Sequence, residues 1–128
     1  DHVAGYADIL KATGCELSYA PQLEPFADAR SVSHGDRFDL AGFKIEARLT
    51  NGHSPGGVTY VVEGLDQPVA VVGDSIFSLS QGGAKQAYDL ALKNNREQIL
   101  SLPEDTILCP GHGPITTVGE ERAHNPFF

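Results

Sequence analysis

The chain has 128 residues, of which 41% are hydrophobic and 20% charged, as in an ordinary globular protein. This length allows a single domain with its own core. No apolar run is long enough to span a membrane, so we expect no membrane partner. The formal net charge of −8 argues against a nucleic-acid partner, because a phosphate backbone requires a basic face.

The N-terminal part predicts a helix followed by a strand and a surface connection. Apolar residues recur at helical spacing at Val3, Tyr6, Ala7 and Leu10. Gly14 stands where the C-terminal cap of that helix belongs, and Asp1-His2 lie at its positively polarised start. A strand-like stretch follows at 15–19, and 21–30 is rich in Pro, Ala and acidic residues, which is typical of a surface connection.

Residues 38–72 predict a run of strands. Alternation on both sides of Ala41-Gly42 indicates a hairpin with one apolar and one wet face. The apolar positions are Phe43, Ile45, Ala47 and Leu49, and the wet positions are Lys44, Glu46, Arg48 and Thr50. Two β-branched runs at 58–63 and 69–72 predict further strands, and the nearly all-apolar second run predicts an inner strand covered on both faces.

The C-terminal part predicts a long helix, a strand and a last helix. The helix spans 84–102, and Pro103 ends it. Its apolar face is formed by Ala84, Ala87, Tyr88, Ala91, Leu92, Ile99 and Leu102. A strand follows at 106–109, and Glu120 and Glu121 are expected in the solvated first turn of the last helix.

Three side chains of the kind that binds metals each follow a strand-like run and lie beside glycine. They are His53 in Asn-Gly-His-Ser-Pro-Gly (51–56), Asp74 in Gly-Asp-Ser-Ile-Phe (73–77) and His112 in Pro-Gly-His-Gly-Pro (110–114). With Asp1-His2, they form the imidazole and carboxylate mixture that zinc, iron and manganese share. Each motif alone is a common turn, but together they predict one metal site or two.

The order of these motifs resembles the metallo-β-lactamase-fold hydrolases, most closely the glyoxalase-II-like group. The hallmarks of that group are His-x-His-x-Asp-His, His-[Ser/Thr]-Pro-Gly, Gly-Asp-x-[Ile/Leu]-Phe and Pro-Gly-His-Gly-Pro. Asp1-His2 correspond to the end of the first motif, and its two earlier histidines are absent. The resemblance implies an α/β fold, an αββα sandwich lacking its N-terminal half, with residues 1–128 as the C-terminal portion of one such domain.

The resemblance also implies the roles of the site residues. Asp1, His2 and His112 with Asp74 would complete one metal site, and His53, Asp74 and the two absent histidines would form the other. Asp74 would bridge the two metals, because a carboxylate has two oxygens. Asp1 would also be catalytic, by holding the nucleophilic water or carrying its proton. The expected cofactor is Zn²⁺, one ion or two, with iron or manganese as alternatives.

The implied function is hydrolysis of a small-molecule ester or thioester through metal-activated hydroxide. Two alternatives stay open: a mononuclear iron sulfur-dioxygenase, and a non-catalytic truncated subunit. The glyoxalase-II-like Gly-Arg-x-Asp stretch is replaced here by Ser-Leu-Ser-Gln-Gly-Gly (78–83), so the sequence does not define the substrate. The strands at 58–62 and 69–72 would expose an apolar face, and its expected partner is another copy of the chain or a separate N-terminal half.

The remaining predictions concern Cys15, Cys109 and Ser75. The two cysteines, the only ones in the chain, are predicted to be buried thiols in a reducing cytoplasm. A disulfide between them, and Cys109 as a thiolate ligand, stay open as alternatives. Ser75 follows Asp74 directly and is expected to orient that carboxylate by a hydrogen bond.

Overall fold

The computed structural model describes residues 4–15, 19–21 and 29–128. The strands are β1 (Tyr19–Pro21), β2 (Arg30–Val32), β3 (Arg37–Leu40), β4 (Phe43–Leu49), β5 (Val58–Glu63), β6 (Val69–Gly73), β7 (Ile76–Phe77), β8 (Ser80–Gln81), β9 (Ile107–Pro110) and β10 (Thr116–Thr117). The helices are α1 (Tyr6–Thr13), α2 (Tyr88–Asn94), the π-helical turn η1 (Asn95–Ile99) and α3 (Val118–His124).

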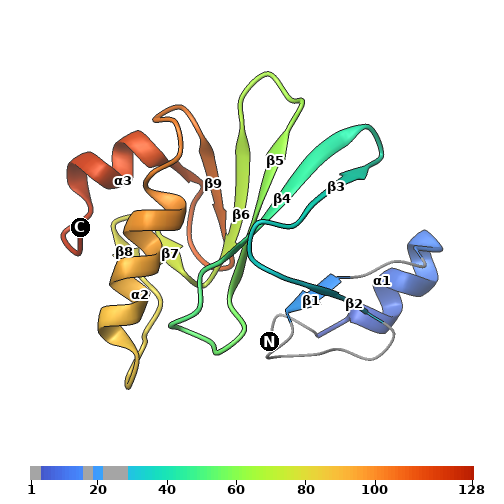
Figure 1. Cartoon of the computed structure of the whole chain (residues 1–128), viewed down its shortest axis with the longest axis horizontal. Coiled ribbons are helices and arrows are strands. Elements are labelled where there is room, and N and C mark those ends of the chain that lie inside the picture. Colours follow the sequence, from blue (N-terminus) through green and yellow to red (C-terminus); the bar gives the residue numbers. More distant parts are fainter. Residues whose placement is uncertain (1–3, 16–18, 22–28) are drawn as a thin grey trace.

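A six-stranded sheet in the order β10-β9-β6-β5-β4-β3 forms the centre of the molecule. The helices α2 and α3 lie to one side of it with the short β7-β8 hairpin, and α1 lies with the parallel pair β1-β2 at the opposite end (Figure 1). The core lies between the sheet and the α2, η1 and α3 segments. Its buried members are Val61, Ala70, Val72, Ile76, Ile99, Leu100, Leu102, Leu108 and Val118.

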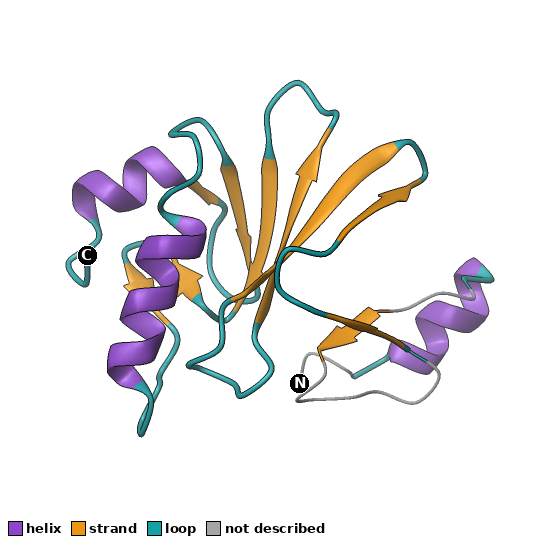
Figure 2. Cartoon of the chain, viewed as in Figure 1, coloured by secondary structure: helices purple, strands orange, loops and turns teal. Residues whose placement is uncertain are grey.

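The strand directions bring three loops to one edge of the sheet. Strand β4 is antiparallel to β5, β5 is antiparallel to β6, and β6 is parallel to β9. Therefore β4, β6 and β9 run the same way and end at the same edge, where the loops after them lie together (Figure 2). These loops contain His53, Asp74 and His112, so the topology gathers residues that are far apart in sequence.

Several predicted elements are confirmed. The hairpin β3-β4 turns at Ala41 and Gly42, which have φ values of 51° and 89°, as a tight two-residue hairpin turn requires. Helix α1 ends at Gly14 in the left-handed conformation, with its N–H donating to Leu10 O. Asp1 and His2, expected at the start of this helix, lie outside the described residues.

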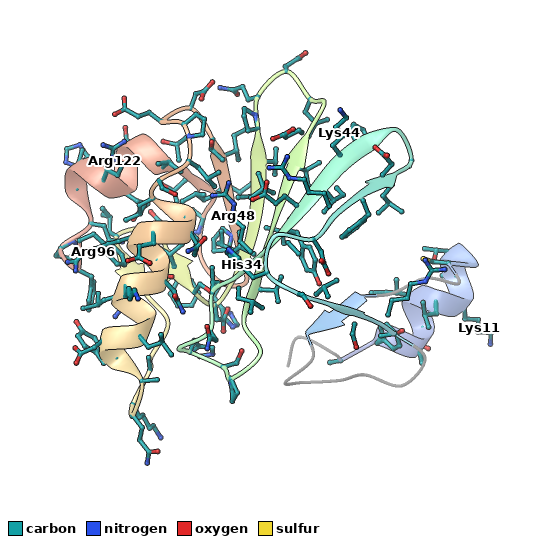
Figure 3. All side chains as sticks on the ribbon, in the orientation of Figure 1. Lys11, His34, Lys44, Arg48, Arg96 and Arg122 are labelled. Carbon is teal, nitrogen blue, oxygen red and sulfur yellow. The ribbon has the colours of Figure 1, made fainter. Side chains whose placement is uncertain are left out.

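The predicted wet face of β4 is exposed only at Lys44. The prediction is wrong for Glu46, Arg48 and Thr50, because this end of the face lies toward η1. Glu46 lies directly opposite Val61 of the core. Arg48 reaches across to η1 and donates a 3.0 Å hydrogen bond to Gln98 O (Figure 3). Thr50 is buried on the same face. Alternation separates the two faces of a strand, but charged side chains that pair with one another can occupy the covered face.

The other face of the sheet is open around β6, so the predicted cover on both faces is also wrong for the described part of the chain. Val71 is 46% exposed although β6 is an inner strand. A strand is inner when it has a hydrogen-bonded neighbour on each side, whereas its two faces are covered only when other layers pack on them. An apolar run does not show which of the two holds. Association of this face with another copy or with a separate N-terminal half stays a prediction.

The predicted helix over 84–102 is also wrong in extent. Residues 84–87 form a turn, α2 begins at Tyr88, and the last part is the π-helical η1. The N-cap Ala87 has no side chain that could accept from the free N–H groups of the first turn. Tyr88 and Leu90 are 46% and 41% exposed, so the apolar spacing does not trace a single buried face.

Helix α3 begins as predicted, but Glu121 is not solvated. Thr117 caps the helix by accepting from Glu120 N at 3.2 Å. Glu121 is fully buried and accepts hydrogen bonds from Leu79 N, Thr116 Oγ1 and Asn125 Nδ2 at 2.9, 2.6 and 2.7 Å. The carboxylate therefore connects α3 to the β7-β8 turn. None of the helices in the described ranges is both long and apolar enough to span a membrane.

The Glu46 carboxylate makes stability depend on pH. Burial of this carboxyl acts to raise its pKa, but hydrogen bonds from Arg48 and Arg37 outweigh burial and hold the pKa below its ordinary value of 4.5. Since the folded pKa is lowered, this stabilisation is present above pH 4.5 and is lost as the pH falls through the folded pKa.

We therefore expect Glu46→Gln to have a lower free energy of unfolding than wild type at pH 7. At about pH 3.5 the difference between the two free energies should be smaller. Urea unfolding at both pH values measures this. A difference that is constant or grows toward acid would show that the ion pairs with Arg37 and Arg48 are not the cause.

Candidate metal centre

His53 lies in the loop after β4, and its ring is fixed by a backbone carbonyl. Thr50 N donates to Gly57 O at 2.8 Å and Gly52 N donates to Ser54 O at 3.0 Å, which holds the loop. The Nδ1 atom of His53 is 2.8 Å from Gly83 O. A carbonyl only accepts, so Nδ1 carries the proton and Nε2 keeps a lone pair. This is the arrangement that metal-binding histidines commonly have.

Asp74 follows β6 and is the residue that both histidines approach. Its side chain is 12% exposed, and its Oδ2 atom lies 3.5 Å from His53 Nε2 and 3.5 Å from His112 Nε2. The preceding Gly73 has a φ of 52°, a left-handed conformation that turns the chain at the end of the strand. One carboxylate oxygen therefore lies between two imidazole nitrogens from separate loops.

His112 follows β9, whose pairing with β6 extends to the site. Gly111 N donates to Gly73 O at 2.9 Å, which joins the loop of His112 to the residue before Asp74. The ring of His112 packs edge-on against Phe77, with centroids 6.0 Å apart and an interplanar angle of 76°. Its side chain is 56% exposed, so the centre faces solvent on this side in the described structure.

The spacing of these groups matches ligands around a small divalent cation. Ligands at about 2.1 Å from a tetrahedral metal are separated by about 3.4 Å. The two measured separations of 3.5 Å agree with this value. Across the ranges that the structure describes, however, no three His, Cys, Asp or Glu side chains form a group sufficient to hold a metal ion. His53, Asp74 and His112 are therefore a partial ligand set, and the predicted Asp1 and His2 lie outside the described residues.

Comparison with known proteins shows which proteins the chain resembles in sequence and in fold. No family model matches the chain. It is 37% identical over 107 residues to the probable metallo-hydrolase YqgX of Bacillus subtilis, covering 78% of this chain and 48% of that protein. It is 32% identical over 115 residues to the hydroxyacylglutathione hydrolase GloC of Haemophilus influenzae, covering 84% and 52%. The chain has the fold of the metallo-β-lactamase superfamily, and these two relatives are named hydrolases.

Solved structures of the superfamily agree with the fold. The structure of TTHA1623 in a di-iron-bound form superposes with a TM-score of 0.77 at 28% identity, over all of this chain and 72% of that one. The α/β architecture predicted from the sequence is thereby confirmed. The chain spans about half the length of the curated relatives it matches.

Two glycines near the superfamily motifs make contacts that a side chain would prevent. At Gly52, which precedes His53, an added Cβ would lie 2.5 Å from Ala91 Cβ of α2. At Gly82, a Cβ would collide with Asp74 O and lie 2.9 Å from His53 Nδ1. The role of Gly82 was not predicted from the sequence, although a Gly82-Gly83 doublet shortly after Asp74 indicates a close approach of the backbone.

The structure corrects the roles expected for Ser75 and the cysteines. The Ser75 hydroxyl donates toward Thr50, with Oγ 3.0 Å from Thr50 Oγ1 and 3.3 Å from Thr50 O, and so does not orient the Asp74 carboxylate. Cys15 and Cys109 form no disulfide. Cys15 is exposed and Cys109 half-buried, because Cys15 follows the solvent-exposed end of α1 rather than entering the core.

Proposed function

We propose that the protein is a metal-dependent hydrolase of an ester or thioester, with His53, Asp74 and His112 among its metal ligands. The observation that carries the proposal is the position of Asp74 Oδ2, at 3.5 Å from the Nε2 atoms of both histidines. Each histidine comes from a different loop. Only the folded sheet brings them together.

The donor types fit a divalent cation such as zinc, iron or manganese. Two neutral imidazoles and one carboxylate suit all three metals, and they do not form the thiolate-rich closed site of structural zinc. One or two ions are expected, and TTHA1623 provides a relative with two irons. We propose Asp1 and His2 as further ligands. When bound, the cation would lower the pKa of a coordinated water and polarise a substrate carbonyl.

The residues of this chain would bind and orient. The hydrogen bond from His53 Nδ1 to Gly83 O keeps the Nε2 lone pair directed at the centre. Asp74 supplies the negative charge that offsets the cations, and its single oxygen between two histidines suits a bridging role. Phe77 packs edge-on against one side of the His112 ring. Asp1 would accept a proton from the attacking water.

The substrate class comes from the named relatives. GloC and the protein of Erythrobacter litoralis, which is 30% identical over 113 residues, are named hydroxyacylglutathione hydrolases. A hydroxyacylglutathione is a thioester, whose carbonyl carbon is open to attack by an activated water. We therefore propose a small-molecule thioester as the substrate of this protein.

Removal and return of metal tests the function. We expect a strong chelator to reduce hydrolysis of a glutathione thioester about a hundredfold or more, and Zn²⁺, Fe²⁺ or Mn²⁺ to restore it. His53→Ala should abolish the restored activity. His124→Ala is the matched control, because His124 is 64% exposed and belongs to α3 and not to any of the three loops.

Two results would contradict this proposal. One is undiminished hydrolysis in the metal-free protein, and the other is an equal loss in the two histidine variants. Oxygen consumption with a glutathione persulfide, in place of thioester hydrolysis, would favour the mononuclear iron sulfur-dioxygenase.

A further inference from the structure

Two consecutive asparagines lie where α2 passes into η1, and each binds the backbone of a different ligand loop. Asn94 Nδ2 donates to Asn51 O at 2.7 Å and to Asn51 Oδ1 at 2.9 Å. Asn95 Nδ2 donates to Ser75 O at 2.8 Å. Asn51 is two residues before His53, and Ser75 directly follows Asp74. One point on the helix therefore contacts both loops.

The helix geometry explains how neighbouring side chains serve two loops. Consecutive residues on a helix point about 100° apart, so adjacent side chains diverge. Asn94 is the last residue of α2 and Asn95 the first of the π-helical η1. Short π-helical segments are frequent at functional sites. The carbonyl acceptors Asn51 O and Ser75 O also fix the amide orientation, because only the NH₂ side can donate to them.

The amide of Asn95 is buried, but only its NH₂ group is hydrogen-bonded. Its side chain is 1% exposed, and within the described part of the chain its Oδ1 accepts no hydrogen bond. A buried polar atom without a partner destabilises the fold. Ser75 O also accepts a 3.4 Å hydrogen bond from Gly82 N, so it keeps a partner if Asn95 is replaced. Asn95 Nδ2 also donates a 3.3 Å hydrogen bond to Gln81 Oε1, so a leucine of similar size would remove the unsatisfied Asn95 oxygen but would also remove this donor.

The same helix also contacts the His53 loop sterically. Ala91 lies one turn before Asn95, and its Cβ is the atom that an added side chain at Gly52 would meet at 2.5 Å. The helix thus approaches the chain directly before His53, and Asn94 then holds Asn51 in that place. Asn95 holds the backbone on the other side, directly after Asp74.

We propose that Asn94 and Asn95 are positioning residues that set the separation between His53 and Asp74 for binding one cation. This inference rests on the proposed metal centre. Asn94 fixes the His53 loop and Asn95 fixes the Asp74 loop. Neither side chain binds the metal. Loss of either amide releases one loop, so the two ligands bind the cation less tightly.

Co²⁺ titration of the metal-free protein, followed by visible absorption, measures the affinity directly. We expect Asn94→Ala and Asn95→Leu each to weaken Co²⁺ binding by about 10- to 100-fold. Lys93→Ala, at an exposed neighbouring position of α2, should change it less than about twofold. Val118→Ala is the second control. It truncates a fully buried core residue whose side chain makes no hydrogen bond to either loop.

If the asparagines only stabilised the fold, their replacement would lower thermal stability without changing Co²⁺ affinity. Val118→Ala should lower thermal stability and leave Co²⁺ affinity unchanged. Asn95→Leu removes two buried hydrogen bonds and should lower both stability and Co²⁺ affinity, so the loss of affinity is what distinguishes it from Val118→Ala. In the metal-free protein, amide hydrogen exchange at 51–57 should accelerate in Asn94→Ala. Exchange at 74–83 should accelerate in Asn95→Leu.

The outcomes separate this inference from the proposed function. Co²⁺ affinity within twofold of wild type in both asparagine variants, with binding lost in Asp74→Asn, would overturn the positioning roles and leave the metal centre standing. Wild-type Co²⁺ binding that is unaffected by Asp74→Asn would overturn the metal centre, and the positioning roles with it.

Discussion

Gly82→Ala is expected to weaken metal binding strongly, although residue 82 supplies no ligand atom. The added Cβ would collide with Asp74 O and lie 2.9 Å from His53 Nδ1. Gly82 is buried between these two groups, so neither can move without shifting a ligand. We expect metal affinity to fall about a hundredfold or more.

The neighbouring glycine is the matched control. At Gly83, an added Cβ meets no atom within 4 Å, and its φ is not in the left-handed region. Gly83 O, which accepts from His53, is a backbone atom that the substitution retains. Calorimetric titration with Zn²⁺ should therefore give near wild-type affinity for Gly83→Ala. Equal affinities in the two alanine variants would show that the Gly82 contact does not determine the geometry of the centre.

Asp74→Asn is expected to remove bound metal and turnover together. The amide keeps the shape of the side chain but not the negative charge that offsets the cations. Both histidines lie 3.5 Å from the same Asp74 oxygen. Among the described residues, no further carboxylate joins them in a ligand group that could take over the role of Asp74. We expect metal content, measured by plasma mass spectrometry, and thioester turnover each to fall about a hundredfold.

The stability of the metal-free protein serves as the control for Asp74→Asn. The thermal midpoint of metal-free Asp74→Asn should stay close to that of the metal-free wild type, since the substitution preserves the volume of the side chain. Undiminished loading with two metals in this variant would remove Asp74 from the bridging role.

The gathering of His53, Asp74 and His112 could be predicted from sequence because each follows a strand and strand ends share edges. Motif order supplied the family, and the comparisons confirm it. The separation of 3.5 Å from one oxygen could not be predicted. The ligand loops are held by contacts of Gly82, Asn94 and Asn95 that form only in the folded chain.

The errors in the fold have a common physical cause. Periodicity reports which residues share a face, but not what covers that face. Glu46 and Arg48 alternate with apolar residues as a wet face would, but Arg48 binds η1. Glu121 looked like a solvated first-turn acid, but three donors from separate segments satisfy it in the core. Such pairings depend on tertiary contacts, which local patterns do not contain.

Helix 84–102 shows the limit of apolar spacing as a guide to helix boundaries. The apolar residues keep helical spacing through the turn at 84–87, although α2 begins only at Tyr88. Where a helix begins depends on how its first N–H groups are capped, which apolar spacing does not show. The apolar spacing also extends across η1, where the buried position between Leu92 and Ile99 is occupied by the polar Asn95. The departure from regular α-helix therefore coincides with residues that hold the ligand loops.

Anomalous X-ray scattering from crystals of the zinc-loaded protein, collected at the zinc absorption edge, tests the shared centre most directly. We predict an anomalous zinc peak at about 2.0–2.2 Å from His53 Nε2 or His112 Nε2. The same peak should lie at about 2.0–2.2 Å from an Asp74 carboxylate oxygen. A zinc peak bound elsewhere, with His53 and His112 more than about 7 Å from it, would contradict the account.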